Sequence, residues 1–108
     1  MEREDLVAEV KELTEMMRCS ANFSSLRSAI LEKNVDPQRA LLASFLEDEN
    51  LNEYGIIVCD RSTVFEYVRS NDTGAAKGFV RWNKVSDISK ALREYPQIEI
   101  AFELLQQA

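Results

Sequence analysis

The fold of this 108-residue chain is decided by the stretch YGIIVCDRSTVFEYVRS, residues 54–70. It begins with a short, apolar and largely β-branched run at 54–59, which is typical of a strand buried on both faces. The polar residues at 60–62 predict a turn, and the run at 63–70 predicts a second strand. The stretch therefore predicts a β-hairpin.

The residues after the hairpin extend the sheet and then return to helix. Residues 71–78 are rich in turn formers and predict a loop, and residues 79–85 predict a third strand. Ser86 or Asp87 is expected to cap a short helix that ends at Pro96. Beyond Pro96 the alternation of apolar and polar residues indicates strand, whereas the good helix formers near the C-terminus indicate helix. We favour helix.

Before the hairpin the pattern is helical. A first helix is predicted by apolar residues that recur on one face, at Leu6, Val10, Leu13 and Met17. A weaker second helix is predicted over 22–33, with Asn34 as its C-terminal cap. Asp36 and Pro37 make a good helix start and predict a third helix. Its buried stripe would consist of Leu41, Leu42, Phe45 and Leu46.

These elements together predict an α+β fold in a single domain spanning residues 1–108. Residues 1–50 would form an N-terminal helical part, and residues 54–85 would form the strands of a three- to four-stranded antiparallel sheet. Residues 86–108 would add C-terminal helical segments. No internal repeat or linker divides the chain.

The composition excludes several classes of function. Nineteen acidic residues against thirteen basic ones give a net charge of −6, which disfavours charge-driven binding to DNA or to anionic lipid. The chain has no histidine, which is the side chain most often used for proton transfer near pH 7. It also lacks a Gly-rich phosphate-binding motif, a nucleophile motif and a paired CxxC motif. We expect no cofactor.

Two side chains are the best candidates for catalysis. Glu66 lies in the middle of the predicted second strand, and Cys59 lies at the end of the first. We expect Glu66 to face solvent and Cys59 to be a small buried group, because no histidine is present to activate the thiol. We therefore expect that the chain is not an enzyme. An enzyme that uses carboxylates with an unrecognised cofactor is the least favoured alternative.

The cysteines and the N-terminus indicate the compartment. Cys19 and Cys59 are the only cysteines, whereas small secreted domains are usually rich in them, so two reduced thiols in the cytoplasm are expected. The acidic N-terminus has neither the basic start nor the apolar run of a signal peptide. The apolar runs are too short to cross a bilayer, so we expect no membrane association.

The acidic segment at 47–53 resembles a metal-binding loop only in part. Asp48, Asn50 and Asn52 have the spacing of the first three ligand positions of an EF-hand. The sixth position is Glu53 where that loop needs glycine, and the twelfth is Cys59 where it needs a bidentate glutamate. We expect a solvated acidic segment with no metal.

Charge is distributed unevenly along the chain. Residues 1–60 contain six basic and thirteen acidic side chains and carry −7, and residues 61–93 contain seven basic and three acidic ones and carry +4. The three glutamates of residues 94–108 complete the total of −6. The molecule is therefore expected to have an acidic helical part and a basic strand-rich part.

The acidic part is the first candidate site. We expect a non-enzymatic interaction module, such as an inhibitor, immunity protein, antitoxin or chaperone-like accessory protein, that binds a protein partner with a basic surface. Carboxylates would steer the encounter, and apolar neighbours would anchor it. The surface would consist of Glu47, Asp48, Glu49, Leu51, Glu53 and Tyr54. Broad apolar helix stripes also make a homodimer an open alternative.

The basic, aromatic strand region is the second candidate site. Interleaved rings and guanidinium groups on an open sheet face can stack single-stranded bases and hold phosphates. The alternative function is therefore binding of RNA or single-stranded DNA, which the acidic composition makes less favoured. Its residues would be Phe65, Tyr67, Arg69, Arg81 and Trp82, and it requires Arg69 and Arg81 to be exposed side by side.

Overall fold

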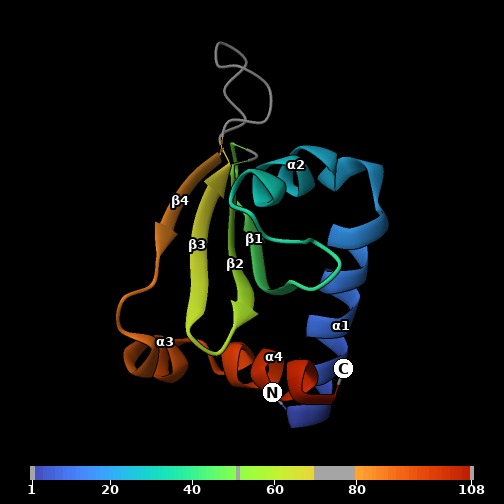
Figure 1. Cartoon of the computed structure of the whole chain (residues 1–108). Coiled ribbons are helices and arrows are strands. Elements are labelled where there is room, and N and C mark those ends of the chain that lie inside the picture. The colour runs from blue at the N-terminus through green and yellow to red at the C-terminus, as the bar shows by residue number, and fades with distance from the viewer. Residues whose placement is uncertain (1, 51, 70–79, 108) are drawn as a thin grey trace.

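A computed structural model describes residues 2–50, 52–69 and 80–107, and its elements confirm the predicted α+β class (Figure 1). The strands form one antiparallel sheet in the order β1-β2-β3-β4. They are β1 (Leu41–Glu47), β2 (Glu53–Asp60), β3 (Thr63–Arg69) and β4 (Val80–Lys84). The helices before the sheet are α1 (Arg3–Cys19), the short 3₁₀ helix η1 (Ala21–Phe23) and α2 (Ser24–Glu32), and those after it are α3 (Ile88–Glu94) and α4 (Pro96–Gln107).

The predicted third helix is wrong, because residues 41–47 form strand β1. Asp36 does organise the backbone after it, but its carboxylate accepts from the N–H of Gln38 and its carbonyl accepts from that of Arg39, which closes a turn. Leu41 and Leu42 are both buried, and they pack into different clusters on the two sides of the sheet. An apolar run buried on two sides fits a strand as well as a helix, and pairing with β2 decides between them.

The predictions for the end of the second helix, for the cap of the short helix after the sheet and for the chain after Pro96 are confirmed. Helix α2 ends in a Schellman motif, in which the N–H of Asn34 donates to Leu31 O and that of Val35 to Ile30 O. Asn34 has φ 61°, the left-handed conformation that this cap requires. Asp87 caps α3 by accepting from the Lys90 N–H, and the chain after Pro96 is helical. The predicted loop at 71–78 lies outside the described residues.

The two faces of the sheet carry separate apolar clusters. On the first face, here called the α4 face, sheet residues pack against buried residues of α4, and the sheet contributes Leu41, Ala43, Ile56, Val58 and Val64. On the second face, here called the α2 face, they pack against η1 and α2, and the sheet contributes Leu42, Ile57 and Tyr67. The sheet is thus covered in part on both sides.

Helix α1 closes the β1 edge of the sheet (Figure 1). Val10 belongs to the cluster on the α4 face, and Met17, two turns later, belongs to the cluster on the α2 face. Between them the buried hydroxyl of Thr14 accepts a hydrogen bond of 3.1 Å from the Leu42 N–H. This bond satisfies a backbone donor at the edge of the sheet and protects that edge from pairing with another chain.

Candidate interaction surface and basic cleft

The α4 face is covered at one end and open at the other. Leu41, Val58 and Val64 form the transverse row beneath α4, and all three are buried. Two rows further along, the register places Leu46, Tyr54, Val68 and Arg81 side by side across all four strands. The three apolar members of this outer row are 67%, 42% and 37% exposed in that order.

A further exposed aromatic residue lies beside this row. Tyr95, between α3 and α4, is 36% exposed and lines the same shallow depression of about 180 Å³ as Tyr54 and Val68. Glu66, in the row between α4 and the outer row, is exposed and also lines it. We call Leu46, Tyr54, Val68 and Tyr95 the open patch. Exposed apolar side chains gathered in this way are typical of an interaction site.

The acidic segment lies at the end of the β1–β2 hairpin and not at the end of a helix. Asp48 organises this loop, because its carboxylate accepts from the N–H groups of Asn50 and Asn52 at 2.8 and 2.9 Å. These hydrogen bonds, above all the one from Asn52, lower the pKa of Asp48. The hydroxyl of Tyr54 also donates to Asp48, at 3.1 Å, and this bond raises the pKa of Tyr54. Asp48 therefore shapes the loop and orients Tyr54.

The remaining residues predicted for the acidic surface have different environments. Glu47 and Glu49 are exposed, and Leu51 lies outside the described residues. Glu53 is directly opposite Glu47 in the sheet, but only 13% of its side chain is exposed. Its Oε2 atom lies 3.8 Å from Nη1 of Arg69 and accepts no hydrogen bond from the described part of the chain. Burial raises the pKa of Glu53, and Glu47 adds to this effect while Arg69 opposes it.

The residues predicted for nucleic-acid binding do not form one open face. Val68 is paired with Arg81, so Arg81 lies on the α4 face, whereas Arg69 lies on the α2 face. Tyr67 is 1% exposed, with its ring against Gly55. Trp82 contacts Tyr67 and Phe65 with ring centroids 5.8 and 5.6 Å apart. The side-by-side arrangement of Arg69 and Arg81 is therefore wrong, because the register places them on opposite faces.

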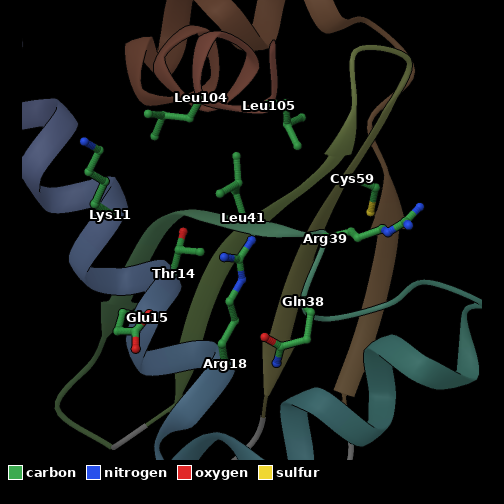
Figure 2. A pocket seen from close by; sticks show the side chains of 10 residues that line it. All are labelled: Lys11, Thr14, Glu15, Arg18, Gln38, Arg39, Leu41, Cys59, Leu104 and Leu105. Carbon is green, nitrogen blue, oxygen red and sulfur yellow. The ribbon is translucent and has the colours of Figure 1, made fainter. Parts of the chain in front are cut away.

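A larger cleft lies between α1, the segment before β1 and the C-terminal turns of α4, with a volume of about 730 Å³ (Figure 2). Its floor includes Leu41, and Leu104 and Leu105 face it from α4. Arg18 of α1 points toward Leu41, whereas Lys11 of α1 and Arg39 line the two opposite sides of the cleft, with the Arg39 guanidinium group on the side of Cys59 (Figure 2). Sequence reasoning missed this cleft because its residues are far apart in the chain and carry no shared motif.

The two candidate catalytic residues have surroundings that do not suggest a reactive group. Cys59 is half-buried at the edge of the cleft, and burial, with a smaller effect of Asp60, raises the pKa of its thiol to about 11. A thiol in that state is protonated at neutral pH and is a poor nucleophile. Glu66 is exposed on the α4 face. Among the described residues, no three cysteine or carboxylate side chains gather closely enough to hold a metal ion.

The comparisons do not assign the chain to a known group. In the described part of the chain, each helix is too short or too polar to cross a membrane. Comparison with protein-family models, with curated proteins and with solved structures finds no match to this chain.

Proposed function

We propose that the protein is a non-enzymatic interaction module that binds a protein partner through the open patch and the acidic hairpin end beside it. The observation that carries the proposal is the outer row of the α4 face, where Leu46, Tyr54 and Val68 are neighbours on three strands and all are exposed. The proposal keeps the acidic and apolar surface expected from the sequence, with Tyr54 as an anchor, and adds Leu46, Val68 and Tyr95 as anchors. The cytoplasm is the compartment proposed for it.

The geometry supports an apolar centre with a charged border. Cross-strand neighbours on a sheet have Cβ atoms roughly 5 Å apart, so the side chains of the outer row make a continuous surface. Tyr54 combines a large apolar ring with a hydroxyl already held by Asp48, which reduces the entropy that binding must remove. Glu49 at the hairpin end and Glu66 beside the patch add negative charge, and Arg81 at the end of the outer row adds one positive charge. Glu47 is paired with Glu53, so it lies at the same hairpin end but on the α2 face. A partner with an apolar centre and a basic border fits this surface.

Substitution within the open patch tests the proposal. The tagged protein would be incubated with native lysate, treated with nuclease and compared with the double variant Leu46→Glu/Val68→Glu by quantitative mass spectrometry. Central apolar anchors are each worth about 2 kcal/mol or more, so capture of a stoichiometric partner should fall by at least about tenfold. Leu31→Glu is the matched control, because Leu31 is 59% exposed on α2, away from the patch.

The outcomes of this experiment separate the alternatives. Equal capture by the double variant and by the control would contradict the open patch as the binding surface. Capture that depends on nucleic acid would instead support the alternative function. Self-association of the wild-type chain that is lost in the double variant, measured by light scattering, would identify a second copy of the chain as the partner.

Charge reversal at the hairpin end tests the role of the acidic border. Glu47→Lys/Glu49→Lys should lower the association rate with the captured partner, and the difference should shrink as salt rises, because exposed charges act mainly through long-range steering. Asp48 is left unchanged, since its substitution would disrupt the loop. Glu4→Lys/Glu12→Lys makes the same change of net charge on α1. An equal loss of rate in both double variants would contradict a local role for the hairpin end.

A further inference from the structure

The cleft between α1 and α4 combines cationic and apolar lining residues in a chain whose net charge is −6. Three cations, Lys11, Arg18 and Arg39, line it together with apolar groups from β1 and α4. We propose that this cleft binds a small amphipathic anion, in which a carboxylate or phosphate group is joined to an apolar chain. This inference is independent of the proposed protein-binding function, because the cleft and the open patch share no residue.

The cations provide an uncompensated positive charge. None of the three makes an ion pair with a carboxylate in the described part of the chain. Arg18 donates to the carbonyl oxygens of Pro37 at 3.4 Å and Ala40 at 3.0 Å, which orients the guanidinium without neutralising it. A guanidinium has five N–H donors, so further donors remain for an anionic group. Oriented arginines bind carboxylate and phosphate with the strongest kind of hydrogen bond.

Among the described residues that line the cleft, the one acidic side chain does not balance these cations. Glu15 accepts a hydrogen bond of 3.2 Å from the Cys19 thiol, one turn further along α1. Three cations and one carboxylate leave a local charge of +2, whereas the whole chain carries −6. The positive cleft is therefore a product of the tertiary structure and not of the overall composition. It concentrates anions locally at a protein that repels them overall.

The apolar side of the cleft provides a place for a chain. Leu41 forms part of the floor, and Leu104 and Leu105 of α4 are half-buried above it (Figure 2). Cys59 adds a thiol that stays neutral, since burial raises its pKa to about 11. A volume of about 730 Å³ falls within the range of roughly 300–1,000 Å³ typical of small-molecule sites. Cations flanking leucines thus fit a ligand with one charged end and one apolar end.

Four probes test the two halves of the ligand separately. Decyl phosphate and decanoate contain both halves, decanol contains only the chain, and inorganic phosphate contains only the head. Binding would be measured by calorimetry below the concentration at which each amphiphile aggregates, and located by backbone amide shifts in NMR spectra. We expect that at least one of the two amphiphiles binds about tenfold more tightly than decanol and than inorganic phosphate. Shorter chains should lose at most about fourfold in affinity per methylene removed.

Substitution of the two outer cations tests the site directly. Lys11→Gln/Arg39→Gln should weaken binding of the amphiphiles by about tenfold and leave binding of decanol unchanged. Arg18 is kept, because its hydrogen bonds hold the segment before β1. Lys33→Gln/Arg93→Gln is the matched control, since both residues are exposed and lie outside the cleft. Circular dichroism and thermal unfolding would confirm that both double variants are folded.

Three results would each overturn the proposal. The first is the absence of binding by both amphiphiles. The second is equal affinity in the two double variants, which would show that the cleft cations do not hold the head group. The third is a set of shifted amides that surrounds the open patch instead of the cleft, which would identify apolar association at a different surface. Equal binding of inorganic phosphate and decyl phosphate would overturn the apolar half of the assignment.

Discussion

Gly55 and Tyr67 depend on each other across the centre of the sheet. They are paired on neighbouring strands, and the Tyr67 ring lies over the position where a Gly55 side chain would be. A Cβ added to Gly55 would meet the ring, with the Cζ atom only 2.6 Å away. The absence of a side chain at Gly55 therefore allows a large ring to be buried on the α2 face.

Gly55→Ala should consequently destabilise the protein. Tyr67 is 1% exposed and packed among other core side chains, so the ring cannot move aside without disturbing them. Overpacking of this kind costs about 1–3 kcal/mol, measured as the free energy of unfolding in urea. The same substitution in a Tyr67→Leu background should cost less, because the ring is gone. Equal costs in the two backgrounds would refute the steric explanation.

Glu53 should make the folded protein less stable as pH rises, whereas most carboxylates in folded proteins have the opposite effect. Burial raises its pKa in the folded state above the usual 4.5, so the folded protein holds the proton more tightly than the unfolded chain does. The stability gained in this way is fully present below pH 4.5 and is lost as pH rises through the folded-state pKa. Glu53→Gln should remove this loss, leaving the variant at least as stable as the wild type at pH 7.

Unfolding in urea at a series of pH values would measure this effect. Glu12→Gln is the control, since Glu12 is exposed on α1 and should follow the wild-type curve. The Glu53→Gln variant also loses the ion pair with Arg69, which lowers its free energy of unfolding. This effect should be small, because the ion pair is long, at 3.8 Å. If the Glu53→Gln variant is clearly less stable than the wild type at pH 7, the stabilisation from the ion pair with Arg69 exceeds the cost of burying the Glu53 charge, and the prediction is wrong.

At the scale of elements, β1 is a strand because of its neighbours. Its outer edge faces α1, and the Leu42 N–H on that side donates to the Thr14 hydroxyl. Its inner edge pairs with β2, with an irregularity in register between Leu42 and Ser44. A helix in its place would have to leave the pairing groups of β2 without partners, which is costly in a buried position.

Thr14→Val tests the contribution of this contact between helix and sheet edge. Valine has nearly the shape of threonine but cannot accept the bond, so the buried Leu42 N–H would lose its partner. We expect a loss of about 1–3 kcal/mol in the free energy of unfolding, measured in urea. Thr14→Ser, which keeps the hydroxyl, should recover part of it. Equal losses for the valine and serine variants would contradict a role for the hydrogen bond.

At the scale of the whole molecule, α1 connects two clusters that the sheet separates. Val10 and Met17 are both fully buried, one on each side of the β1 edge. Arg3 near the start of α1 also pairs with Glu103 of α4, although this exposed pair should contribute little. A helix shared by both clusters should make them unfold together.

This connection predicts a single cooperative transition. Met17→Ala should cost about 2–5 kcal/mol and Val10→Ala about 2 kcal/mol, from lost burial and the cavities left behind. In both variants, far-ultraviolet circular dichroism and the fluorescence of Trp82 should change at the same urea concentration. Leu31→Ala, at an exposed position, should change stability little. Separate transitions would show that the two clusters are independent and would contradict the single domain expected from the sequence.

Local chemistry determined much of this protein directly from its sequence. The β2–β3 hairpin follows from its β-branched runs, the end of α2 from Asn34, the start of α3 from Asp87, and the helix after Pro96 from its composition. Each depends on residues close together in the chain, where side-chain shape, capping and turn chemistry act without help from distant segments.

Only the tertiary structure decided the identity of β1, the opposite placement of Arg69 and Arg81, the open patch and the basic cleft. The first three depend on which strand pairs with which and in what register, because a shift of one residue would move a side chain to the other face of the sheet. The cleft depends on how α1 and α4 pack beside β1. Leu46 shows the difference, since an apolar residue expected in a buried helix stripe lies 67% exposed on an edge strand. The physical reason is that pairing and burial are set by long-range contacts, which local propensity does not encode.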